Sequence, residues 1–130
     1  MKRDMDLVRK ILLSIEEQYE DVALYDFKID GYDMKTVAYH CNILYTGGFI
    51  EDFAGNYSDN EICDFAISGL TWEGHEFLDI IRNDEVWNKT KDTIKQKKLP
   101  YALDIFRDIA KAIVSAATQA AIKSLINPTP

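Results

Sequence analysis

The sequence predicts a mostly α-helical fold that contains one small β-hairpin. Apolar residues recur every three or four positions in residues 5–19 and 33–46 and again beyond residue 70, which is the spacing of helices that bury one face. In residues 49–67 they alternate instead about a polar turn, as paired strands require. With 130 residues, of which 47% are hydrophobic and 28% are charged, the chain can bury a hydrophobic core and has the composition of an ordinary globular protein.

The first expected element is a helix over residues 5–19 with Asp4 as its N-cap, because an aspartate side chain accepts a hydrogen bond from the first turn. One face of this helix should enter the core. That face comprises Met5, Val8, Ile11, Leu12, Ile15 and Tyr19. Residues 20–30 lack a helical period, so we expect an irregular segment there, with a short edge strand at residues 27–29.

A second helix is expected over residues 33–46, capped by Asp33 and ended by Gly47 and Gly48, since glycine takes the left-handed C-terminal conformation without steric cost. Its inward stripe comprises Met34, Val37, Ala38, Cys41, Leu44 and Tyr45. Its outward face carries the candidate nucleic-acid-binding residues Lys35, Thr36, Tyr39, His40 and Asn42. Asparagine can pair with adenine, and lysine with guanine or phosphate. The alternative is an ordinary polar exterior.

Two strands, residues 49–53 and 61–67, are expected to pair about the polar turn between them. Their half-buried face comprises Phe49, Phe53, Cys63, Phe65 and Ile67. Their polar face is acidic and comprises Glu51, Asp52, Asp59, Glu61 and Asp64, with no Lys or Arg in residues 47–70. A phosphate backbone would repel this hairpin. Glu51, Asp52 and Asp64 are therefore candidates for contact with a basic protein surface, the alternative being a solvated face.

Two further helices are expected after the hairpin. The first is capped by Thr71 and should pack four side chains beneath the sheet. These are Trp72, Phe77, Leu78 and Ile81. The second starts at Asn83 or Asp84 and is the most basic segment of the chain. Its candidate phosphate-contacting residues are Lys89, Lys91 and Lys95, and the alternative is again a solvated face.

Pro100 suits the first turn of a final helix. At about 1.5 Å per residue this helix should be roughly 35–40 Å long, more than a small domain easily covers. Its Ala-rich surface allows close helix approach, so we expect a homodimer through Ile113, Ala117 and Ala120, with packing inside one chain as the alternative. No segment reaches the roughly 20 apolar residues that a membrane span requires, so we expect no membrane contact.

The segment GYDMKTVAYHCNILYTGGFIEDF, followed by FAISGLTWEGHEFL, resembles the recognition helix, wing and closing helix of a winged helix-turn-helix domain. LTWEGHEF is similar to the LTxxG turn that closes the wing in several winged-helix transcription regulators. Few residues surround Gly31 and Tyr32, so the helix that usually precedes the recognition helix is shortened or lost. The resemblance implies a winged-helix-like domain over residues 1–84, a C-terminal helical extension over residues 85–126 and a tail at residues 127–130.

Three separated stretches, MKRDMDLVRKILL, YHCNILYTGGFIE and LTWEGHEFLDIIRNDEVWNKTK, together resemble domain of unknown function family 2513, which is found in bacteria and their phages. The resemblance covers most of the chain up to about Lys98. Because the family carries no established activity, it implies no catalytic residues. What it implies is an architecture and a role in gene control within a mobile element.

The residues give little support to an enzyme. The sequence has no GxSxG motif and no glycine-rich phosphate loop, and its two histidines, His40 and His75, fall on separate predicted helices. These histidines and the two cysteines, Cys41 and Cys63, lack the paired spacing of zinc ligands. We expect no catalysis, cofactor or metal. The opening MKRDMDLVRK lacks the apolar stretch of a signal peptide, so we expect a cytoplasmic protein with reduced thiols.

Two hypotheses of function remain. The first is a winged-helix DNA-binding or regulatory protein that acts on double-stranded DNA, in a homodimer. The alternative is an acidic winged-helix module that binds a basic protein rather than DNA. The net charge of −7 weighs against DNA unless basic residues are concentrated on one face.

Overall fold

The computed structural model of the chain describes residues 1–126, and within that range it contains five α-helices and one three-stranded antiparallel sheet. The predicted fold class, mostly α with a small β-hairpin, is therefore confirmed. The chain forms two compact units, Met1–Leu78 and Asp79–Pro130, whereas the sequence placed a domain boundary at residue 84. The predicted tail at residues 127–130 lies outside the described residues.

Helix α1 (Met5–Gln18) begins at the predicted cap. The Asp4 side chain accepts a hydrogen bond from the Leu7 N–H at 3.2 Å, which satisfies one of the donors that a helix start leaves open. The buried face of α1 comprises Met5, Leu7, Val8, Ile11, Leu12 and Ile15. The three-and-four spacing of the apolar residues therefore predicts this helix correctly except at Tyr19, which is the C-cap residue and is only half-buried.

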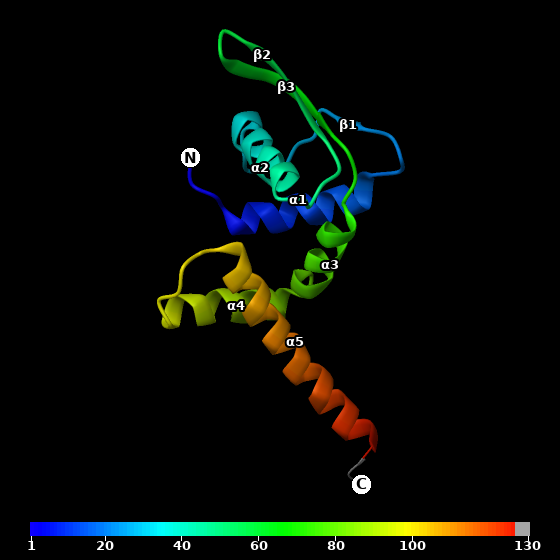
Figure 1. The fold of residues 1–130 in the computed structure, drawn as a ribbon, viewed down its shortest axis with the longest axis vertical. Coiled ribbons are helices and arrows are strands. Elements are labelled where there is room, and N and C mark those ends of the chain that lie inside the picture. The colour runs from blue at the N-terminus through cyan, green and yellow to red at the C-terminus, as the bar shows by residue number, and fades with distance from the viewer. Residues whose placement is uncertain (127–130) are drawn as a thin grey trace. The chain divides into compact units, whose positions relative to one another are not determined.

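Helix α2 (Met34–Thr46) also has its predicted bounds. Asp33 accepts a hydrogen bond from the Thr36 N–H at 2.8 Å, and the chain leaves the helix at Gly48, where φ is +84°. Only glycine takes that conformation without a steric penalty. Figure 1 shows α2 lying between α1 and the strand pair that follows it.

The sheet has the strand order β1-β3-β2, so β3 is central. Its strands are β1 (Leu24–Tyr25), β2 (Phe53–Ser58) and β3 (Glu61–Ile67). Ile67 pairs with Leu24 on one side and with Phe53 on the other. Strands β2 and β3 form the hairpin, whose tip residues Asp59 and Asn60 both have positive φ. Such a two-residue turn matches the twist of the strands that it joins.

Two expectations about the strands are wrong in position. The edge strand forms at residues 24–25 and not at residues 27–29, because Phe27 is buried in the core instead. The first strand of the hairpin begins at Phe53, while residues 49–52 continue the pairing only through single hydrogen bonds and a bridge from Ile50 to Leu70.

A β-bulge in β3 changes which side chains face inward. Asn56 pairs with Asp64 and Tyr57 pairs with Ile62, so Cys63 is an extra residue with no partner across the strand pair. The extra residue reverses the alternation of side chains. Cys63 is exposed, and the half-buried position that the sequence assigned to it belongs to Ile62.

The turn that precedes α3 (Trp72–Ile81) closes the base of the hairpin. The Thr71 hydroxyl donates to the Gly48 carbonyl at 2.5 Å and accepts from the Gly74 N–H at 3.0 Å. The backbone at Gly74 comes so close that a Cβ there would clash with the Phe49 carbonyl oxygen. The LTxxG pattern thus has a physical basis here: threonine caps the helix and glycine leaves room for the neighbouring backbone.

The buried side of α3 includes Phe77, Leu78 and Ile81, as predicted. The ring of Phe77 lies 5.4 Å from that of Phe49. Trp72 is 76% exposed, which corrects the expectation that it packs beneath the sheet. It lies about two and a half turns before Ile81, so its side chain leaves the opposite side of the helix.

The second unit contains α4 (Asp84–Gln96) and α5 (Leu103–Ile126). Asn83 caps α4 by accepting a hydrogen bond in the first turn. The two helices pack through aromatic side chains, with the Trp87 and Phe106 rings 5.2 Å apart. The described part of this unit is therefore a pair of helices that are joined by a short loop and share an aromatic contact.

Helix α5 begins at Leu103, so Pro100 lies ahead of the first turn and not in it. Phe106 and Ala110 are buried, whereas the side chains from Ser115 onward are exposed. With a mean hydropathy of 1.3 over its most apolar window, α5 is, among residues 1–126, the one helix long and apolar enough to cross a membrane. Only 6% of that stretch is buried. Length and composition alone are weak evidence for a membrane span, so the expectation of no membrane contact stays a prediction.

Gly74→Ala should lower the free energy of unfolding, by about 1–3 kcal/mol, the usual cost of forcing atoms into a packed site. Helix propensity alone would predict the opposite, a gain in stability, because alanine favours a helix by about 1 kcal/mol over glycine. Urea unfolding measures the change, with the exposed Glu76→Ala on the same helix as the control. A stability of the Gly74 variant equal to that of the control would contradict the close approach of the Phe49 carbonyl.

Candidate functional site

Four of the five residues predicted on the outward face of α2 reach the surface. They are Lys35, Thr36, Tyr39 and Asn42. Lys35, Tyr39 and Asn42 are spaced by four and three positions and so share one side of the helix. Two residues of the predicted inward stripe differ from expectation, since Met34 is 39% exposed and Tyr45 is 41% exposed.

His40 is not part of the outward face, contrary to the prediction. Its side chain is 1% exposed. The Asp4 N–H donates to Nε2 at 2.8 Å, so the ring proton is on Nδ1, which donates to the Thr36 carbonyl at 2.8 Å. His40 therefore joins the start of α1 to the first turn of α2. The sequence could not show this, because the residues that cover His40 lie more than thirty positions earlier.

The same hydrogen-bonded cluster includes a tyrosine that the sequence did not single out. The Tyr32 hydroxyl donates to the Asp4 carboxylate at 3.3 Å, and the Lys10 Nζ lies 5.4 Å from the centre of the Tyr32 ring. Desolvation, and after it the negative charge of Asp4, raises the pKa of Tyr32 above its ordinary value. The irregular segment before α2 is thereby held against α1.

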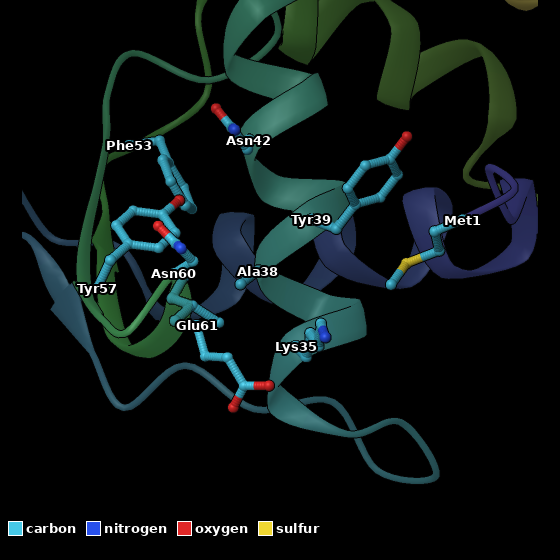
Figure 2. A pocket seen from close by; sticks show the side chains of 10 residues that line it. Met1, Lys35, Ala38, Tyr39, Asn42, Phe53, Tyr57, Asn60 and Glu61 are labelled. Atoms are coloured by element: carbon cyan, nitrogen blue, oxygen red, sulfur yellow. The ribbon is translucent and has the colours of Figure 1, made fainter.

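A pocket of about 170 Å³ lies between α2 and the hairpin (Figure 2). Helix α2 contributes Lys35, Ala38, Tyr39 and Asn42 to its lining. The hairpin contributes Phe53, Tyr57, Asn60, Glu61 and Ile62. Met1, which carries the N-terminal ammonium, also lines the pocket. The pocket thus combines three aromatic rings and two amides with the opposite charges of Lys35 and Glu61, beside the N-terminus. It includes three of the predicted nucleic-acid-binding residues of α2, and its hairpin residues were not predicted as a site.

The strands of the hairpin orient the aromatic wall of the pocket. The Phe53 ring stacks on the Phe65 ring at 5.8 Å with an interplanar angle of 23°. The Tyr57 ring lies along the strand over Gly55, where an added Cβ would meet the ring at 2.9 Å. Ile62 reaches the lining because of the bulge one residue later. The positions of Phe53, Tyr57 and Ile62 therefore follow from the local geometry of the two strands.

Charge is distributed unevenly between the two units. Residues 1–78 contain six Lys or Arg and sixteen Asp or Glu, a net charge of −10, whereas residues 79–130 have a net charge of +3. The predicted protein-interface residues Glu51, Asp52 and Asp64 are all exposed. Opposite the acidic hairpin, α2 carries Lys35 as its one cation. The unit that contains the pocket is therefore strongly acidic, while the pocket itself has one carboxylate, that of Glu61.

The predicted phosphate-contacting lysines belong to the second unit and so are not in the pocket. The Lys89 Nζ lies 3.1 Å from the Glu85 carboxylate, and the Lys91 Nζ lies 5.9 Å from the centre of the Trp87 ring. Lys95 is exposed. The predicted dimer residues of α5 comprise a half-buried Ile113 and an exposed Ala117 and Ala120.

The titratable side chains do not gather into a metal site in the part of the chain that the structure describes: residues 1–126 hold no group of three or more His, Cys, Asp or Glu that could bind a metal ion. The two thiols differ in environment. Burial raises the pKa of Cys41 to about 12, while Cys63 is exposed. Since the thiolate is the reactive form, only the second should react readily.

His40→Phe keeps a ring but removes both nitrogens, leaving the Asp4 N–H without its acceptor. We expect it to lower the free energy of unfolding by about 1–3 kcal/mol, the cost of an unsatisfied buried polar group. His40→Gln can place Oε1 near the Nε2 position and should lose less. Urea unfolding of both variants tests this, and equal losses would show that ring packing, and not the hydrogen bond, is what matters.

A thiol reagent at mildly alkaline pH should label the folded chain at one cysteine and the urea-unfolded chain at both. The folded pKa of Cys41 is raised, so its reactive thiolate is scarce until the pH approaches 12. Cys63→Ser should abolish the labelling of the folded chain, and Cys41→Ser should leave it intact. Mass spectrometry distinguishes these results; rapid labelling of folded Cys63→Ser would contradict the burial of Cys41.

Comparison with known proteins places this arrangement in a family. The family model described as hypothetical protein (DUF2513) matches residues 2–100, which include every element up to the end of α4. A protein of Haemophilus influenzae described as an uncharacterized protein is 45% identical over 116 residues, which cover 88% of this chain and 97% of that protein. No solved structure matches the chain. The chain therefore belongs to the DUF2513 family, as its three separated sequence stretches predict.

Proposed function

We propose that this chain is an acidic winged-helix-like module that binds a basic protein partner. The observation that carries the proposal is the net charge of −10 on the unit that contains α2 and the hairpin. Exposed carboxylates at Glu51, Asp52 and Asp64 extend this charge along the hairpin. Complementary charge steers association and selects among partners, so a surface rich in lysine and arginine fits this one.

The order of elements supports a winged-helix-like fold for the module. Helix α1, strand β1, helix α2 and the hairpin follow one another, and β3 lies between β1 and β2. No helix forms within residues 26–33, where the helix that precedes a recognition helix usually lies. A standard docking geometry on DNA includes that helix. Its loss favours a use of the fold other than ordinary DNA reading.

DNA binding is the second candidate, and one observation favours it. Lys35, Tyr39 and Asn42 share the accessible side of α2, which is where a recognition helix presents its base-contacting residues. In a homodimer formed through α5, two such helices would need to lie about 34–36 Å apart to meet successive turns of the major groove. The acidic hairpin beside α2 opposes this use, because phosphate repulsion weakens association. Homodimerisation and a cytoplasmic location stay predictions.

The test compares binding of the full chain to a cationic peptide of alternating glycine and lysine with binding to a random-sequence DNA duplex. A triple variant removes three of the five negative charges of the hairpin region and keeps the size of each side chain: Glu51→Gln, Asp52→Asn and Asp64→Asn. A control variant changes the same net charge in the same unit but outside the hairpin: Glu17→Gln, Glu20→Gln and Glu76→Gln. We expect the hairpin variant to lose about tenfold in peptide affinity at low salt and the control to lose far less.

The outcomes separate the two candidates. Equal losses in both variants would show that only net charge matters and would contradict docking on the hairpin. Duplex binding that falls steeply with salt, together with no binding of the peptide, would replace the proposal with the DNA-binding candidate.

A further inference from the structure

We propose that the pocket between α2 and the hairpin binds a single arginine side chain of the basic partner. The inference rests on the proposed function and gives it a specific anchor. An acidic surface attracts lysine and arginine alike, so charge alone leaves the partner poorly defined. The pocket adds shape and chemistry that distinguish the two cations.

The walls of the pocket suit a flat cation. Phe53, Tyr57 and Tyr39 line it, and the two tyrosines are 61% and 39% exposed, so both rings are accessible to a ligand. Arginine stacks its planar, weakly hydrated guanidinium on aromatic faces, whereas the lysine ammonium is compact and strongly hydrated. Ala38 and Ile62 supply an aliphatic surface for the methylene stem.

The polar residues of the pocket match the donors of a guanidinium. Figure 2 shows Glu61 and Asn60 on the hairpin side and Asn42 on α2. A guanidinium has five N–H donors in a fixed plane and can bind a carboxylate with two parallel hydrogen bonds. The Glu61 carboxylate can take such a pair, and the amide oxygen of the neighbouring Asn60 can accept a further donor, while Asn42 lies toward the other end of the pocket. A lysine ammonium satisfies fewer of these acceptors at once.

Lys35 opposes the binding of a cation. Figure 2 shows it on α2, apart from the Phe53 and Tyr57 rings on the hairpin side, and shows the Glu61 carboxylate extending away from those rings toward the Lys35 part of the helix. The positive charge of Lys35 therefore disfavours the same guanidinium that the Glu61 carboxylate favours. The two charges therefore have opposite effects on the same ligand, which gives the proposal two tests of opposite sign.

The experiment measures affinity of the full chain for three peptides of equal length, in which glycine alternates with arginine, with lysine or with uncharged citrulline. We expect the arginine peptide to bind about five- to tenfold more tightly than the lysine peptide, and the citrulline peptide to bind far more weakly than both. Tyr57→Leu and Glu61→Gln should each reduce the arginine preference to near unity. Lys35→Gln should strengthen binding of the arginine peptide.

Asp59→Asn is the matched control for Glu61→Gln, because it removes the same charge from the hairpin tip at a residue that does not line the pocket. It should weaken both cationic peptides equally and keep the arginine preference. The variants lie at exposed positions, and circular dichroism of each checks that the fold is kept.

The pocket proposal and the proposed function fail in different ways. Equal affinity for the arginine and lysine peptides, or an arginine preference that survives both Tyr57→Leu and Glu61→Gln, would overturn the pocket proposal and leave the basic-partner function standing. Failure of both cationic peptides to bind would overturn the proposed function, and the pocket proposal with it.

Discussion

The closure of the hairpin base by Thr71 is the constraint on which the first unit depends. Its hydroxyl links two places that are far apart in the sequence, because it donates to the Gly48 carbonyl at the end of α2 and caps the start of α3 through Gly74. The chain therefore leaves α2 and returns to α3 at one point. The hairpin between these points has to run beside α2, and the space between helix and hairpin becomes a pocket. A threonine and a glycine at fixed spacing thus position a whole β-ribbon.

The hairpin also places side chains in the pocket that the alternation of apolar and polar residues does not predict. The bulge at Cys63 turns Ile62 toward α2, and Tyr57 folds over Gly55. Ile62 and the Tyr57 ring therefore line the pocket together with Glu61 and Lys35. Interfaces commonly combine a few buried anchor residues with surrounding charge that steers the encounter. In the proposed interface, the carboxylates of the hairpin would attract a basic partner, and the residues that line the pocket would distinguish arginine from lysine.

Charge and family membership delimit where this surface lies. The acidic hairpin, α2 and, apart from Met1, the residues that line the pocket fall within residues 2–100, which match the DUF2513 family, whereas α5 falls outside them. Residues 79–130 carry a net positive charge, and they form a different unit from the acidic residues 1–78. The lysines of α4 that the sequence indicated as phosphate contacts are partly engaged by neighbours on their own helix, through Glu85 and Trp87. The first unit, with its net charge of −10, therefore lacks the basic character that is typical of a DNA-binding surface.

The sequence by itself determined the parts of the structure that depend on neighbours a few positions apart. Asp4, Asp33 and Asn83 cap the helices as predicted, because capping joins residues three positions apart and needs no distant partner. Only the tertiary structure decided the burial of His40 and the exposure of Cys63. The first depends on which distant segment covers α2, and the second depends on strand register, which one extra residue reverses. The pocket belongs to this second class, since its lining comes from the N-terminal residue, a helix and a hairpin whose contacts no local pattern specifies.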